Sequence, residues 1–185
     1  MIAAISALTS GALCHSRRAR FRRQRPDVRL EISDVDTATV HRRIKLDEAD
    51  IGILSTSAED QQIGEVIRRD ALGIVCRAGG PISQAVGSGA ARSWGLLELE
   101  PLIENPLCHL VASELVSGLL LHCNLEARNT TALLAFVRSG LGATVLPESA
   151  IYHSPEQLEF VVPRDPESWR ELRKMHSKDR HLSPA

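Results

Sequence analysis

The stretch VRLEISDVDTATVHRRIKLDEADIGILSTS, residues 28–57, decides the fold class because its apolar residues change their period twice. Residues 28–32 alternate apolar and polar side chains, which is typical of a strand with one covered face. Residues 36–45 have the period of a helix, with an acid and a threonine at the start. Residues 49–54 return to a buried strand, so the stretch predicts a strand, a helix and a strand.

The residues before this stretch add one more strand and one more helix. Residues 2–6 are rich in Ile and Ala and predict a short buried strand. Thr9 and Ser10 can cap a helix that runs to about Arg25, where Pro26 follows as a stop signal. The order strand-helix-strand-helix-strand predicts a parallel sheet with right-handed crossovers.

The second half of the chain alternates less regularly. We expect a strand at 71–76, an exposed loop at 79–91, a short helix or turn at 96–102, a helix at 132–137 capped by 129–131, a strand at 141–147, and extended pieces at 158–162 and 169–176. Gly140 suits the left-handed position that often follows the end of a helix.

Length and charge narrow the class of protein. The chain has 185 residues, of which 43% are hydrophobic and 24% charged, with a formal net charge of −1. This length allows one substantial core or two small lobes, and the charge argues against a chain that coats nucleic acid. No segment reaches the roughly 18 apolar residues of a membrane span. Residues 1–8 predict a buried strand rather than a secretory signal, because the arginines follow the apolar segment.

Hydroxyl side chains gather where the predicted strands end and helices begin. In an open parallel sheet ligands bind beyond the carboxyl ends of the strands, and helix N-termini favour anions. The candidate ligand-binding residues are therefore Ser6, Thr9, Ser10, Thr37, Ser55, Thr56, Thr130 and Thr131. Such a set would hold a carboxylate by neutral hydrogen bonds. The alternative is that each of these residues only caps a helix.

Six arginines at residues 17–25 form the strongest charge feature of the chain. A nucleic-acid patch would use such charge for phosphate contacts, but Phe21 is the only aromatic residue among them. A solvated helix face, or pairing with acidic groups of a partner subunit, explains the run better.

No catalytic residue, metal site or cofactor is expected. The sequence has no G-x-S-x-G elbow, no P-loop and no H-E-x-x-H. None of the four cysteines forms a C-x-x-C pair. Only Cys108-His109 and His122-Cys123 suggest metal chemistry, and neighbouring residues of a strand point to opposite faces. Reduced cysteines of a cytoplasmic protein are the better interpretation.

Three stretches resemble the effector-binding domain of LysR-type transcriptional regulators. Residues 21–30 are similar to that family's F-x-x-x-x-P-x-V-x-L passage, and residues 47–53 to its G-x-x-D-[LI]-[AG]-I strand. Residues 137–147 are close to its V-x-x-G-x-G-x-x-x-L-P motif, and the ending at 178–185 also fits. The order and spacing of these motifs cover nearly the whole chain.

The resemblance implies two α/β lobes of the type II periplasmic-binding-protein kind, joined by two crossing strands. The first lobe would comprise about residues 1–72 and 152–185, and the second about 73–151. The resemblance also implies a small effector, often a carboxylate, in the cleft between the lobes. It further implies a homodimer or higher oligomer in the cytoplasm. DNA would be bound only through an N-terminal winged helix-turn-helix that residues 1–185 do not include.

Two other classes of protein remain possible from the residues alone. A periplasmic-type solute-binding protein for a small organic anion would have the same fold class, and it would require export. A small α/β enzyme would need an acid–base pair or a nucleophile, and the sequence offers neither. The sensor domain of a transcriptional regulator is the leading interpretation.

Overall fold

The computed structural model describes residues 2–4, 20–21, 23–28, 31–35, 37–56, 64–151, 156–164 and 168–176. The chain packs into two compact units, one formed by residues 1–69 and 170–185 and the other by residues 70–169. The chain passes from one unit to the other within β4 (Glu65–Arg77) and again within β7 (Trp169–His176). The described residues 156–164 and 168–169 thus pack with the second unit, whereas we expected them in the first lobe from the sequence.

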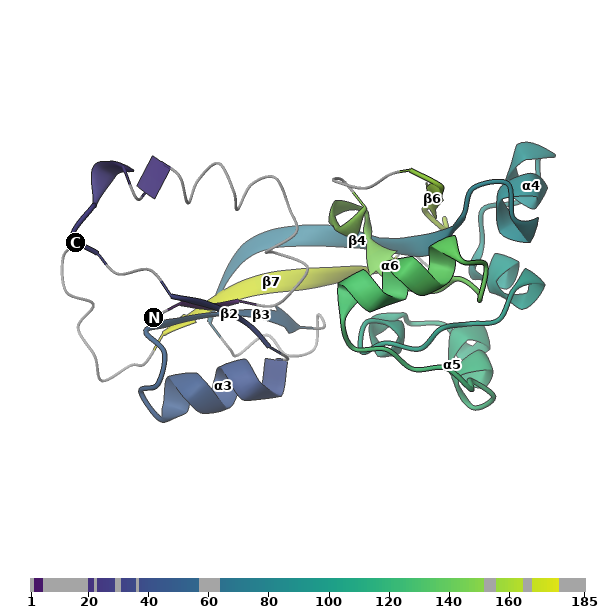
Figure 1. The fold of residues 1–185 in the computed structure, drawn as a ribbon. Coiled ribbons are helices and arrows are strands. Elements are labelled where there is room, and N and C mark those ends of the chain that lie inside the picture. The colour runs from purple at the N-terminus through teal and green to yellow at the C-terminus, as the bar shows by residue number, and fades with distance from the viewer. Residues whose placement is uncertain are drawn as a thin grey trace. The chain divides into compact units, whose positions relative to one another are not determined.

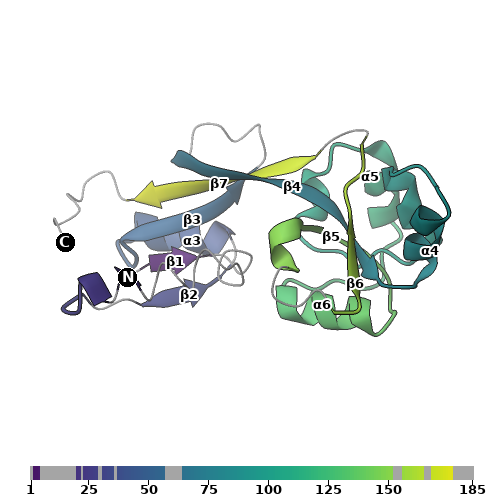
Figure 2. The same ribbon diagram turned by 90° about the horizontal axis from the view of Figure 1, so that it is seen from above.

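The first unit is built on a sheet whose first three strands are parallel, as predicted. Strand β1 (Ile2–Ala4) lies between β2 (Ile32–Asp34) and β3 (Ile51–Thr56) and pairs in parallel with both. Strand β7 pairs antiparallel with β3, and β4 lies next to β7. Figure 2 shows β2, β1, β3 and β7 side by side. The carboxyl ends of β1, β2 and β3 therefore meet at one edge of the sheet.

Helix α3 (Thr37–Lys45) covers one face of this sheet, below β3 in Figure 1. Its apolar side chains Val40 and Ile44 are buried and form a small core with Ala49 and Leu54. The helix lies so close to the sheet that a Cβ on Gly52 would come within 2.5 Å of Val40. The residues of β3 on the side of α3 are thus Gly52, Leu54 and Thr56, which are all buried.

Two strands of the first unit differ in their bounds from the prediction. Strand β2 begins at Ile32, so most of the predicted strand at 28–32 lies before it. Strand β3 continues to Thr56 instead of ending at Leu54. Pairing with neighbours sets these bounds, because Ile32 and Ile51 both lie opposite Ile2. The predicted helix at 9–25 falls largely outside the described residues, of which 20–21 and 23–24 are helical.

In the second unit, β4 is the central strand. It pairs antiparallel with β5 (Thr144–Pro147) on one side and with β6 (Leu158–Val161) on the other. The remaining elements are α4 (Pro81–Gly87), the 3-10 helices η1 (Trp94–Leu99), η2 (Cys108–Leu110) and η3 (Glu148–Ala150), α5 (Glu114–Leu120) and α6 (Thr130–Arg138). Buried side chains from both faces of β4 form two hydrophobic clusters.

The predictions for the second unit were confirmed in part. Helix α6 is capped by Asn129, whose Oδ1 accepts a hydrogen bond from the Ala132 amide at 3.2 Å, and Gly140 follows it with a φ of +78°. The predicted exposed loop at 79–91 was wrong, because it contains α4, whose Ile82 is fully buried. Among the described residues, no helix is both long and apolar enough to span a membrane.

Candidate anion-binding site

Three of the predicted hydroxyl residues come together at the carboxyl end of β3. Thr37 is the first residue of α3, and its Oγ1 donates to the Ser55 carbonyl oxygen over 3.4 Å. This distance exceeds the usual 2.5–3.0 Å for a hydroxyl donor, so the bond is weak. The Thr37 hydroxyl can therefore turn toward a better acceptor.

The hydroxyls of Ser55 and Thr56 are buried without a hydrogen bond. Neither oxygen has a hydrogen-bond partner among the residues that the structure describes. Thr56 is only 4% exposed, and it is on the α3-facing side of β3. A buried hydroxyl without a partner destabilises a protein, so such a group often marks a site that a ligand completes.

The N-terminus of α3 adds a positive potential at the same place. Helix N-termini carry free amide groups and the positive end of the helix dipole. The first turn of α3, from Thr37 onward, contains no acidic residue, although Asp36 directly precedes it in the sequence, and Arg42, Arg43 and Lys45 are in the last turn. Backbone amides and hydroxyls together make this edge suitable for an anion.

A cluster of charged side chains, which the sequence analysis did not identify, lies beside these hydroxyls. Glu171 of β7 lies directly opposite Thr56, so the two side chains share a face of the sheet. Its Oε2 accepts hydrogen bonds from Arg173 Nε and Nη2 at 2.9 and 2.7 Å. Its Oε1 accepts one from Arg69 Nε at 2.9 Å. The hydrogen bond from Arg173, reinforced by Arg69, holds the pKa of Glu171 below its ordinary value.

Of the other predicted residues, the structure describes only Thr130 and Thr131, which do not join this group. Ser6, Thr9 and Ser10 lie outside the described residues. Thr130 and Thr131 open α6 in the second unit, where Thr130 is buried and Thr131 is exposed.

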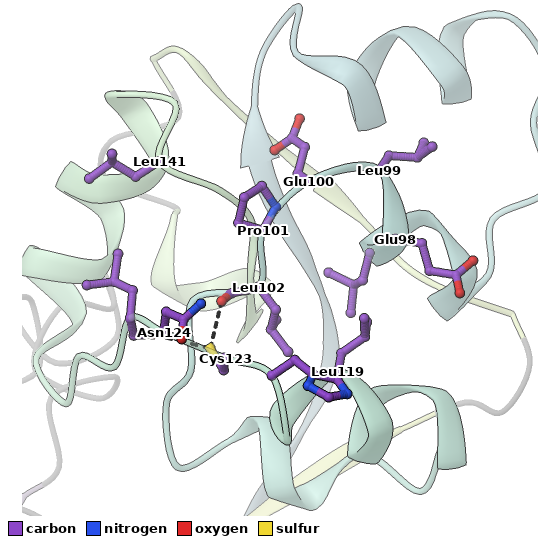
Figure 3. A pocket seen from close by; sticks show the side chains of 12 residues that line it. Glu98, Leu99, Glu100, Pro101, Leu102, Leu119, Cys123, Asn124 and Leu141 are labelled. Carbon is purple, nitrogen blue, oxygen red and sulfur yellow. Dashed lines mark hydrogen bonds between the residues drawn. The ribbon is translucent and has the colours of Figure 1, made fainter.

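The second unit has a groove of about 420 Å³, the leucine groove, which Figure 3 shows from close by. None of the predicted hydroxyl residues lines it. It is lined by Leu97, Glu98, Leu99, Glu100, Pro101, Leu102, Leu119, His122, Cys123, Asn124, Leu125 and Leu141. The carboxylates of Glu98 and Glu100 would repel an anion, whereas the carboxylate beside the edge of the first unit, that of Glu171, is paired with two arginines, so that edge is the better anion site.

The described residues include no group of three or more His, Cys, Asp or Glu that could hold a metal ion. Of the two adjacent pairs noted in the sequence, His109 Nε2 lies 3.0 Å from Glu104 Oε1. Cys123 Sγ donates to the Leu102 carbonyl oxygen, as the dashed line in Figure 3 shows. These contacts explain both side chains without a metal.

Two of the cysteines are core residues with suppressed acidity. Cys76 and Cys108 are buried and free. Burial, aided by the charges of Glu100 and Glu159, raises the pKa of Cys76 to about 12. Burial likewise raises the pKa of Cys108 to about 11. Because the thiolate is the reactive form, both thiols are poor nucleophiles at neutral pH.

We expect Cys76 and Cys108 to resist alkylation while the chain is folded. Treatment with iodoacetamide at pH 7, followed by peptide mass spectrometry, should label them at least about a hundredfold more slowly than in urea, because burial limits both access and thiolate formation. The same peptides from urea-unfolded chain are the control. Equal labelling of the folded and unfolded chain would contradict the burial of these thiols.

The solved structures that resemble the chain share its fold over nearly its whole length. The effector-binding domain of a BenM variant has a TM-score of 0.73 and 20% identity, and the match covers 98% of this chain and 87% of that one. The CcmR regulatory domain of Synechocystis in complex with 2-PG has a TM-score of 0.75 and 16% identity, and the match covers 98% of this chain and 88% of that one. The reduced OxyR regulatory domain of Pseudomonas aeruginosa has a TM-score of 0.69 and 18% identity, and the match covers 96% of this chain and 85% of that one. No curated protein sequence matches the chain.

The two α/β units, between which the chain passes twice, are the type II periplasmic-binding-protein fold that was predicted. The model of the LysR substrate binding domain matches residues 2–185. The chain therefore belongs to this family, which confirms the resemblance found in the sequence. It is a ligand-binding regulatory domain of the LysR type.

Proposed function

We propose that the chain senses a small carboxylate effector for a LysR-type transcriptional regulator, and that the effector binds where β3 ends and α3 begins. The observation that carries this proposal is the buried hydroxyl of Thr56, on the α3-facing side of β3, which has no hydrogen-bond partner among the described residues. Because Ser55 and Thr56 are neighbours in β3, their side chains point to opposite faces, and a carboxylate on the α3-facing side would accept a hydrogen bond from the Thr56 hydroxyl. The weakly held hydroxyl of Thr37 would supply a further donor.

Among the similar structures is the BenM effector-binding domain with its effector benzoate. This supports a carboxylate ligand for the present chain, because hydroxyls and helix amides at the proposed site suit that group. Sensing requires that the effector bind one arrangement of the domain better than another, since only differential affinity shifts an equilibrium. The proposal includes no catalysis and no cofactor.

Family membership supports three further proposals. The domain would pair as a homodimer or higher oligomer. It would act in the cytoplasm. It would reach DNA only through a separate N-terminal domain of the whole regulator. The match covers 62% of a full-length BenM mutant, so that regulator has further residues outside the matching region, which supports the proposal of a separate domain.

Thermal unfolding against a panel of carboxylates tests the effector site. A bound ligand at one hundred times its Kd should stabilise the chain by about 2.7 kcal/mol, which is readily detected. Replacing Thr56 with Val should raise the stability of the free chain by about 1 kcal/mol, because an unpaired buried hydroxyl is removed. The same change should abolish or strongly reduce the ligand-induced shift.

This combination separates ligand binding from folding, since a merely structural hydroxyl would not make the free chain more stable when lost. Thr37→Ala should weaken the ligand-induced shift as well, by removing one donor. Benzamide serves as the neutral counterpart of benzoate and should give no shift. If carboxylates stabilise Thr56→Val as much as the parent chain, the effector does not bind at this edge.

A further inference from the structure

We propose that Arg69 is a second anchor for the effector, which makes the site selective for dianions over monoanions. This inference rests on the proposed function and adds the charge class of the ligand. The sequence predicts hydroxyls without a fixed cation at this site, and the structure adds a cation that the sequence pattern does not indicate.

The position of Arg69 follows from two pairings in the first unit. Thr56 and Glu171 are opposite each other in β3 and β7, on the face that α3 covers. Arg69 of β4 binds the same Glu171 through Nε and Nη2, at 2.9 and 2.8 Å. The guanidinium of Arg69 is therefore separated from the Thr56 hydroxyl by the side chain of Glu171, on the same face of the sheet.

The cluster carries an excess of positive charge. Among the described residues, the two arginines Arg69 and Arg173 bind one carboxylate, that of Glu171, so these three side chains have a net charge of +1. Arg173 is not accessible to a ligand, because its side chain is only 8% exposed. Its Nη1 also donates a hydrogen bond to the Gly64 carbonyl oxygen at 3.2 Å. Of these two arginines, Arg69 is the one that remains available to a ligand.

Arg69 combines a fixed orientation with free donors. Its side chain is 65% exposed, and Glu171 uses two of its five N–H groups, so three remain. Glu171 is itself held by Arg173, so the guanidinium of Arg69 is oriented before a ligand arrives. A preoriented guanidinium binds a second carboxylate or a phosphate through paired hydrogen bonds.

A purely structural role explains Arg69 poorly. An ion pair with one largely exposed partner adds little to stability, and Glu171 already has a buried partner in Arg173. Arg69→Gln should therefore fold as the parent chain does. This makes Arg69 a suitable residue for a binding test.

Isothermal titration calorimetry of the chain with matched probes tests the inference. The pairs are benzoate with phthalate and butyrate with succinate, at constant ionic strength. At least one dianion, phthalate or succinate, should bind the parent chain about tenfold more tightly than the monoanion with which it is paired. Arg69→Gln should remove this preference. Arg69→Lys should retain part of it, because lysine keeps the positive charge but cannot form the paired hydrogen bonds of a planar guanidinium.

Arg68→Gln is the matched control, since it makes the same charge change on the neighbouring residue of β4, whose side chain points to the other face. It should keep the full preference for the dianion. If Arg69→Gln keeps that preference, or if the parent shows none while monoanions bind, the inference fails and the proposed effector site stands. If no probe of the panel binds the parent chain, the carboxylate site fails together with the inference.

Discussion

Replacing Gly142 with Ala should lower the free energy of unfolding by about 3–5 kcal/mol, the largest effect we expect from a single methyl group in this chain. Gly142 has a φ of +148°, a conformation that residues with a side chain rarely adopt. A Cβ at this position would lie 2.0 Å from the backbone oxygen of Pro101. The neighbouring Ala143 amide donates to that same oxygen at 2.9 Å, so the two segments cannot separate without losing a hydrogen bond.

Urea unfolding followed by circular dichroism measures this loss. Gly118→Ala is the control, because Gly118 lies within α5 and a Cβ there would meet nothing within 4 Å. That change should stabilise the chain by about 0.5–1 kcal/mol, since alanine favours the helix over glycine. If both variants have the same midpoint, the close approach at Gly142 is not a feature of the folded chain.

Replacing Asn105 with Leu should destabilise the chain by about 3 kcal/mol, because it breaks a buried hydrogen-bond network. Asn105 is 2% exposed. Its Nδ2 donates to Thr144 Oγ1 at 2.8 Å and to the Val145 carbonyl oxygen at 3.0 Å, and its Oδ1 accepts from the Leu107 amide at 2.8 Å. Leucine has a similar volume but leaves these groups without their partner.

The same urea titration, run on a double-mutant cycle, shows whether the network causes the loss. Thr144 extends the hydrogen-bond network, because its Oγ1 donates to the Ile103 carbonyl oxygen at 2.7 Å. Asn105→Leu combined with Thr144→Val should lose less than the sum of the two single changes, because the residues share a bond. Asn124→Ala, at an exposed position, should stay within about 0.5 kcal/mol of the parent. Additive losses in the cycle would show that the two side chains act independently.

Part of the candidate site could be predicted from the sequence. Thr37, Ser55 and Thr56 were identified because the ends of parallel strands and the starts of helices leave local signals, namely hydroxyls after an apolar run. The structure differs in one respect that matters for chemistry. Ser55 and Thr56 are the last residues of β3 itself, so their hydroxyls are buried rather than presented by a loop.

The charged cluster could not be predicted in this way. Arg69 and Glu171 are 102 residues apart in the chain and meet only because β4 and β7 are neighbours in the sheet. The sequence pattern predicts a strand only from Ala71, since residues 65–70 lack a clear apolar period. It predicts an extended piece at 169–176 but indicates no partner strand for it. Strand pairing over such separations leaves no local period that a sequence pattern could reveal.

The sequence alone determined the fold class and the family, because periodic apolar residues and the motifs at 21–30, 47–53 and 137–147 are local features. Tertiary structure decided the rest. Pairing partners set the bounds of β2 and β3, and burial of Ile82 placed a helix where glycine and serine suggested a loop. The approach of distant strands brought a cation beside the hydroxyls. Local preferences are weaker than packing and pairing, which depend on residues far away in the chain.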